Sequence, residues 1–128
     1  MNDAVLSEAI HRLIHSSVPD LDALELLVFL ADHPDRAWNA ESLAGAVRPM
    51  SESAIRQYLG LYREQKLVEP AEPGVVFRPA TPELASAVRE LCTAYNERPV
   101  TLIRTVYAIA DARKIQAFAD AFRLKKEP

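Results

Sequence analysis

Prolines limit the length of the helices that this chain can form. The sequence has 128 residues, of which nine are prolines, and the residue before a proline avoids the α-helical region of backbone conformation. A helix is therefore expected to stop at Val18-Pro19, at His33-Pro34 and at Arg48-Pro49. Between these stops, apolar residues recur at helical spacing. The sequence thus predicts several separate helices.

Composition places the chain among ordinary globular proteins. Hydrophobic residues make up 49% and charged residues 26%, which excludes a disordered or fibrous chain. No apolar run approaches the roughly 20 residues that span a bilayer, and the amino terminus lacks the basic-then-apolar order of a secretory signal. The single cysteine, Cys92, excludes an internal disulfide and is expected to be a buried structural thiol. We expect one cytoplasmic domain that does not associate with a membrane.

The residues that carry enzymatic chemistry are not arranged for it. Gly45, Gly60 and Gly74 lie far apart, so they cannot form the glycine-rich loop that binds phosphate groups. His11 and His15 have a spacing that can bind a metal on a helix, but no HExxH order surrounds them. We interpret them as half-exposed surface histidines. Neither an enzyme nor a cofactor or metal site is predicted.

Capping residues mark where the helices are expected to begin. The expected starts are Asn2/Asp3 for a helix over 3–17, Asp20 for an apolar helix that stops at His33-Pro34, Asn39 for a helix over 40–47, Ser51 for a helix through about Gln65, and Thr81-Pro82 for a helix to about Tyr95. Pro99 permits another start, with apolar residues through Ile109. A final helical stretch is expected over Ala112–Lys125.

Short extended segments separate some of these helices. Arg36-Ala37-Trp38 is one, and Trp38 is expected to pack as an apolar anchor. Residues 67–69 and 75–78 are rich in Val, Leu and Phe and flank the turn residues 71–74, which predicts a two-stranded hairpin. The expected fold class is therefore mainly α with a small β-hairpin, that is, α+β.

Three stretches of the chain resemble a known fold. Residues 41–47 resemble its second helix, with Leu43 and Val47 toward the core, residues 51–59 resemble the start of its recognition helix, and residues 61–68 resemble its exit. Together with the order helix, strand, helix, turn, helix, hairpin, they resemble the winged helix-turn-helix of MarR-like and ArsR-like transcriptional regulators.

The resemblance covers residues 21–79 of a single domain spanning 1–128. Residues 1–18 and 82–125 are then flanking helices. One position departs from the family pattern, because Lys66 stands where the family usually has glycine before Leu-Val. A left-handed helix end at Lys66 costs on the order of 1 kcal/mol relative to glycine.

The resemblance implies a transcriptional regulator that binds double-stranded DNA. The residues that it implies for base contacts are Ser53, Arg56 and Gln57, and those for contacts to the DNA backbone are Arg48, Ser51, Arg63 and Arg78. A plainer interpretation stays open, in which Arg56 and Gln57 are solvated residues of a surface helix.

The charge of the chain weakens the case for DNA binding. The formal net charge is −3, and the turn of the hairpin carries Glu72 and no basic residue. An alternative is therefore a winged-helix adaptor that binds another protein and has no significant affinity for DNA. Specific DNA binding by so few cations is expected to need a dimer, which doubles the contacts.

The flanking helices carry two apolar faces that must be covered. These faces are Val5/Leu6/Ile10/Leu13 and Ile115/Phe118/Phe122/Leu124. Either they pack on the rest of the domain, or they pair with a second copy across a two-fold axis. The second possibility predicts a homodimer.

Overall fold

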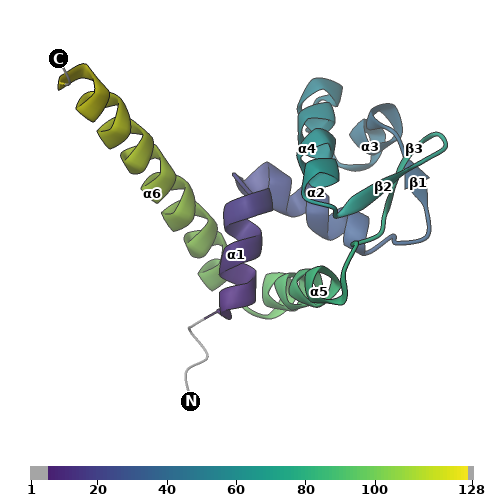
Figure 1. Ribbon diagram of the computed structural model, residues 1–128. Coiled ribbons are helices and arrows are strands. Elements are labelled where there is room, and N and C mark those ends of the chain that lie inside the picture. The colour runs from purple at the N-terminus through teal and green to yellow at the C-terminus, as the bar shows by residue number, and fades with distance from the viewer. Residues whose placement is uncertain (1–5, 127–128) are drawn as a thin grey trace.

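A computed structural model describes the backbone of residues 6–126 and the side chains of residues 6–123 (Figure 1). The elements in chain order are α1 (Glu8–Ser17), α2 (Leu21–Ala31), β1 (Ala37–Trp38), α3 (Ala40–Ala46), α4 (Glu52–Glu64), β2 (Val68–Ala71), β3 (Gly74–Phe77), α5 (Pro82–Glu97) and α6 (Pro99–Lys126). The chain is mainly helical with a small antiparallel sheet. The α+β class predicted from the sequence is confirmed.

Most of the predicted helix starts are found. Asp20 accepts a hydrogen bond from the N–H of Ala23 at 2.9 Å, and Ser51 and Thr81 cap α4 and α5 in the same way. Asn39 caps α3 and forms a reciprocal capping box with Ser42. Each cap satisfies backbone N–H groups that have no partner within their own helix. These capping oxygens therefore fix where four of the helices begin.

The predicted start of the first helix was wrong. Residues 6 and 7 are not helical, and α1 begins at Glu8 with Ser7 as its cap. The hydroxyl of Ser7 accepts the N–H of Ile10 at 3.2 Å, which supplies a cap later in the chain than Asn2/Asp3. The positions Asn2, Asp3 and Val5 lie outside the described residues.

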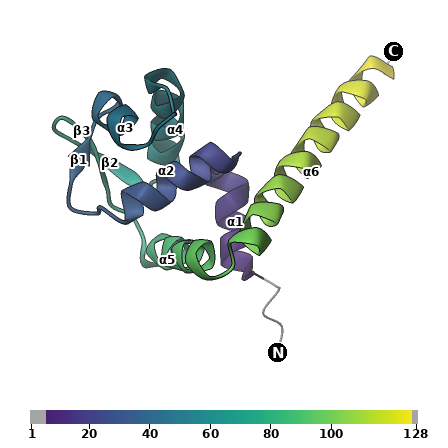
Figure 2. The ribbon, with the colours of Figure 1, turned by 180° about the vertical axis from the view of Figure 1, so that it is seen from behind.

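The predicted division of the last helical region was also wrong. Residues 99–126 form one continuous helix, α6, instead of one helix to Ile109 and another over Ala112–Lys125. No proline or glycine lies between Val100 and Lys126, so nothing in the sequence stops the helix. The second half of α6 extends away from the other helices (Figures 1 and 2).

The core forms around α2, which crosses the middle of the molecule (Figure 2). Leu24, Leu26, Leu27 and Leu30 are fully buried on it, so α2 is apolar nearly all round, as a central helix must be. α1 packs against α5 and α6, and α2 packs against α5. This packing covers the apolar side of α1, because Ile10 and Leu13 on the helix and Leu6 just before it are all buried.

The strands form a three-stranded antiparallel sheet in the order β1-β3-β2. Trp38 pairs with Val75, and Val68 pairs with Phe77. Trp38 is buried, and its ring meets that of Phe29 edge-on at 5.1 Å. The indole thus anchors the sheet to α2, as the sequence predicts. Only two residues, Glu72 and Pro73, separate β2 from β3.

α4 ends in a left-handed turn at Lys66. Its φ is 66°, and Lys66 is the only non-glycine residue with positive φ in the described chain. The N–H of Leu67 donates to the carbonyl of Tyr62 at 2.9 Å, and the N–H of Lys66 donates to that of Arg63 at 3.1 Å. This pair of bonds is the Schellman motif, in which the left-handed residue is usually glycine.

Replacement of Lys66 by glycine is expected to raise the free energy of unfolding by about 0.5–1 kcal/mol. Relief of the left-handed strain, roughly 1–2 kcal/mol, exceeds the extra flexibility that glycine gives the unfolded chain, roughly 0.5–1 kcal/mol. Urea unfolding of Lys66→Gly measures the gain. Lys66→Ala removes the same charge without relieving the strain, and an equal gain in that variant would contradict the explanation.

Gly74 allows the hairpin to lie close to β1. A Cβ atom at this position would clash with the carbonyl oxygen of Trp38 and would lie 2.9 Å from the Cα of Asn39. Gly74→Ala is therefore expected to destabilise the fold by about 1–3 kcal/mol, measured as a lower urea midpoint. Gly45→Ala is the matched control, because nothing lies within 4 Å of its added Cβ. This variant should not be destabilised and should gain about 0.5–1 kcal/mol, because alanine favours a helix over glycine.

Candidate nucleic-acid interface

One face of α4 is fixed to the core. Ile55, Leu59 and Tyr62 are buried along it at helical spacing. The hydroxyl of Tyr62 donates to the carbonyl of Ala23 at 2.6 Å, in the first turn of α2. A buried hydrogen bond of this kind fixes both the position and the rotation of α4 relative to α2. The opposite face of α4 must then point to solvent.

A second tyrosine of α4 contacts the same end of α2. The hydroxyl of Tyr58 lies 2.9 and 2.8 Å from the two carboxylate oxygens of Asp20. The same carboxylate caps α2. Burial, and next the hydrogen bond to Asp20, raise the pKa of the Tyr58 hydroxyl above its usual value of 10. Burial likewise raises the pKa of Tyr62.

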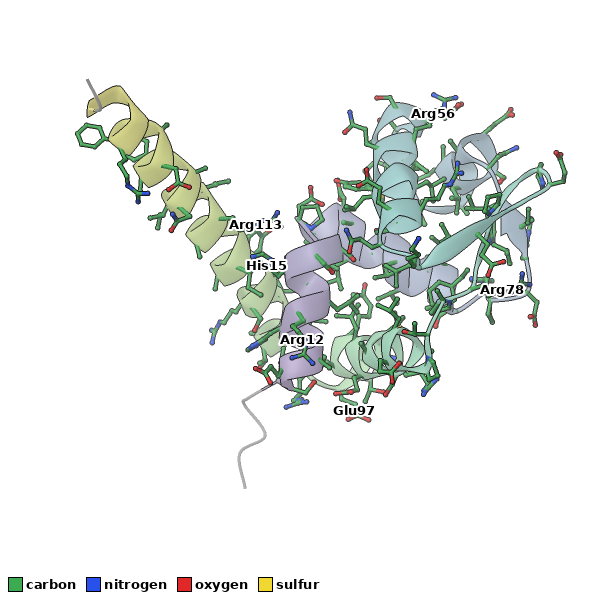
Figure 3. The ribbon with its side chains drawn as sticks, viewed as in Figure 1. Arg12, His15, Arg56, Arg78, Glu97 and Arg113 are labelled. Atoms are coloured by element: carbon green, nitrogen blue, oxygen red, sulfur yellow. The ribbon has the colours of Figure 1, made fainter. Side chains whose placement is uncertain are left out.

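The exposed face of α4 carries the residues predicted to contact bases. Ser53, Arg56 and Gln57 are all exposed, and their spacing of three and four residues places them on one face of the helix. Gly60 follows on the same face and adds no side chain. Arg56 lies near the amino-terminal end of α4, which points away from the core (Figure 3). The structure thus brings the three predicted base-contact residues together.

Arg56 has an ion-pair partner that the sequence prediction missed. Its Nη2 donates to Glu52 Oε1 at 2.9 Å, one helical turn earlier. The Arg56 side chain is largely exposed to water and that of Glu52 is partly exposed, and such a pair stabilises a helix by only a few tenths of a kcal/mol. The spacing of four residues between Glu52 and Arg56 is the signal that could have revealed it.

Three of the predicted backbone-contact residues lie on or next to α4. Arg48 is exposed in the turn between α3 and α4, and Arg63 is exposed in the last turn of α4. Neither has an ion-pair partner among the described side chains. Ser51 already uses its hydroxyl to cap α4 by accepting the N–H of Ala54 at 3.1 Å. Its hydroxyl can still donate to a phosphate oxygen.

Arg78, the fourth predicted backbone contact, lies apart from the others. It follows β3 and donates to Glu69 Oε1 at 3.1 Å. Figure 3 shows Arg78 beside the strands, well away from Arg56 on α4. Sequence reasoning placed Arg78 at the base of the hairpin but could not show that Glu69 neutralises it, because the two residues meet only through the pairing of β2 with β3.

Another arginine is also engaged near the hairpin. The guanidinium carbon of Arg36 lies 4.1 Å from the centroid of the Trp38 ring, a cation–π contact. Glu72 in the hairpin turn is exposed. The hairpin therefore offers an acidic tip and no basic one, as its sequence indicates.

The other sequence candidates lie outside this interface. His11 and His15 are both exposed on α1, and the described residues contain no group of three or more His, Cys, Asp or Glu that could hold a metal ion. Cys92 is half-buried, whereas the sequence predicted a buried thiol. Burial, with Asp32 nearby, raises the pKa of this thiol to about 11. No helix in the described part of the chain is long and apolar enough to cross a membrane.

The shifted tyrosines predict a loss of stability at alkaline pH. Both hydroxyls keep their protons more firmly in the folded chain than in the unfolded one, so the stability that they contribute is complete below pH 10 and is lost as the pH rises above 10. The free energy of unfolding should fall less steeply between pH 9 and 11 in Tyr58→Phe than in the native chain. Asp20→Asn keeps a capping oxygen and should also reduce the slope. Equal slopes in all three proteins would contradict the assignment.

Comparison with known proteins adds no relative. No protein-family model, no curated protein and no solved structure matches the chain.

Proposed function

We propose that the chain is a DNA-binding transcriptional regulator with a winged helix-turn-helix, acting as a homodimer. In this proposal α4 is the recognition helix and enters the major groove, and the β2–β3 hairpin is the wing. The observation that carries the proposal is the outer face of α4, where Ser53, Arg56 and Gln57 are exposed together while the opposite face is fixed to α2.

The topology around α4 supports this function. The order α2, β1, α3, α4, β2, β3 agrees with the fold that the sequence resembles. α3 packs against α4, and β2 follows directly after the Lys66 turn. A helix held in this way can approach DNA without rearrangement, which lowers the entropic cost of binding.

The side chains on α4 suit direct contact with base edges. An arginine such as Arg56 can donate two hydrogen bonds to guanine, and Gln57 can bind adenine in the same bidentate way. Arg56 must first leave Glu52. That pair contributes only about 0.2–0.5 kcal/mol, whereas a bidentate contact favours the right base over a wrong one by about 1–3 kcal/mol. Loss of the pair therefore costs less than the contact to the right base provides.

Few cations are available for contacts to phosphates, which is why the proposal includes two copies. Arg48 and Arg63 are exposed without ion-pair partners among the described side chains, whereas Arg78 is paired with Glu69. Two copies supply about four such contacts, so affinity should fall roughly 100-fold between about 50 and 200 mM salt.

A protein-interaction adaptor without significant DNA binding is the second candidate. Specific observations favour it: the hairpin turn carries the exposed Glu72, and Glu52 and Glu69 neutralise Arg56 and Arg78. Such an acidic hairpin repels DNA and suits a basic partner protein.

Fluorescence anisotropy with random-sequence duplex DNA at about 50 and 200 mM salt separates the two candidates. We expect binding that weakens steeply with salt. Arg56→Ala combined with Arg63→Ala should raise the dissociation constant at the lower salt at least tenfold, because both cations are lost from α4. Absence of binding at both salt concentrations would favour the adaptor.

The matched control is Arg12→Ala combined with Arg89→Ala. It removes the same number of positive charges from α1 and α5, where both side chains are exposed, and Arg12 lies far from Arg56 (Figure 3). Binding should change less than about threefold. An equal loss in both double variants would mean that only net charge matters and that α4 has no special role.

A further inference from the structure

The large apolar side chains that the described chain leaves exposed are all on one helix. Between 52% and 74% of each is accessible to solvent, and they are Val100, Tyr107, Ile115, Phe118 and Phe122, all on α6. At about 100° per residue they fall within an arc of about 80°. They lie along one side of α6, which we call the outer stripe.

The outer stripe cannot turn toward its own domain. The opposite face of α6 is already buried through Leu102 and Val106, against α1, α2 and α5. Farther along, Arg113 Nη1 donates to the carbonyl of His15 at 2.6 Å and ties α6 to the last turn of α1. The sequence left open whether the face containing Ile115, Phe118, Phe122 and Leu124 packs on the domain. The first three do not, and the side chain of Leu124 lies outside the described residues.

Two opposite charges lie within the outer stripe. Arg104 and Asp111 are both exposed and are seven residues apart, so they point in nearly the same direction two turns from each other. Neither has an ion pair or hydrogen bond with another described side chain. Their separation along the axis is about 10 Å at 1.5 Å per residue, too far for them to pair within the chain.

We propose that the outer stripe binds the outer stripe of a second copy in antiparallel orientation, with Arg104 of each chain paired with Asp111 of the other. The two-fold axis then passes between residues 107 and 108. This arrangement is isologous, as most dimer interfaces are. It forms two Arg104–Asp111 pairs, one on each side of the axis. This pairing rests on the proposed function in one respect. The second copy would supply the second DNA-binding surface that the proposed function requires.

Charge complementarity selects both the occupant and the orientation. In a parallel pair each residue meets its own copy, so Arg104 would face Arg104 and Asp111 would face Asp111, which is repulsive. In the antiparallel pair Val100 lies opposite Ile115, and Tyr107 lies near its own copy at the axis. Phe118 then reaches past Pro99 of the second copy, to the turn between its α5 and α6.

Charge reversal tests this pairing with the full chain. Arg104→Glu alone and Asp111→Arg alone should each weaken the dimer at least tenfold, because each creates two like-charged contacts across the axis. Arg104→Glu combined with Asp111→Arg should restore it to within about threefold of the native value. Sedimentation equilibrium measures the association, since one chain has a mass of 14.3 kDa.

The control Arg89→Glu reverses an exposed charge on α5, outside the stripe, and should leave the dimer unchanged. Circular dichroism checks that every variant keeps its helices. A native chain that stays monomeric would overturn the proposal, as would a dimer that survives both single reversals or that the double reversal fails to restore. None of these readouts involves DNA, so a failure here is separate from a failure of DNA binding.

Oxidative crosslinking tests the register independently. In a background of Cys92→Ala, Tyr107→Cys places two thiols beside the two-fold axis and should give a crosslinked dimer. Ala112→Cys, exposed on the same helix but about 100° away from the centre of the stripe, should not. Equal crosslinking at both positions would overturn the proposed register.

Discussion

The position of α4 in this protein depends on the start of α2, where one carboxylate and one backbone carbonyl accept hydrogen bonds from the two tyrosines of α4. Asp20 caps α2 and accepts the hydroxyl of Tyr58, while the carbonyl of Ala23 accepts that of Tyr62. Because Tyr62 is fully buried, loss of its bond would leave a polar group without a partner, at a cost of about 1–3 kcal/mol. The rotation of α4, and with it the set of side chains that it exposes, follows from this junction.

Local signals in the sequence predicted much of the fold. Short polar side chains at Asp20, Asn39 and Thr81 cap helices where they were expected to, because a cap is satisfied by N–H groups only two or three residues away. The same logic failed at the first helix, where Ser7 competes as a cap with Asn2/Asp3. The break expected between Ile109 and Ala112 is also absent from α6, because no proline or glycine interrupts the helix there.

The candidate interface was predictable only in part. Helical periodicity alone places Ser53, Arg56 and Gln57 on the face opposite Ile55 and Leu59. The partners of the charged residues follow other rules. The pairing of Arg56 with Glu52 is local and visible in the sequence, but that of Arg78 with Glu69 requires the hairpin register. Contacts between residues distant in sequence, such as Asp20 with Tyr58, cannot be predicted from spacing within a helix.

The hydrogen bond between Arg113 and the carbonyl of His15 joins the middle of α6 to the last turn of α1. A helix of 28 residues is about 42 Å long. A small tilt of α6 at this contact therefore displaces the ends of the helix much more than the contact itself. In the proposed dimer such a tilt changes the distance between the two copies of α4. If the proposed function holds, the spacing of the DNA half-sites would depend in part on this contact at the end of α1, which lies outside the proposed DNA-binding face of α4.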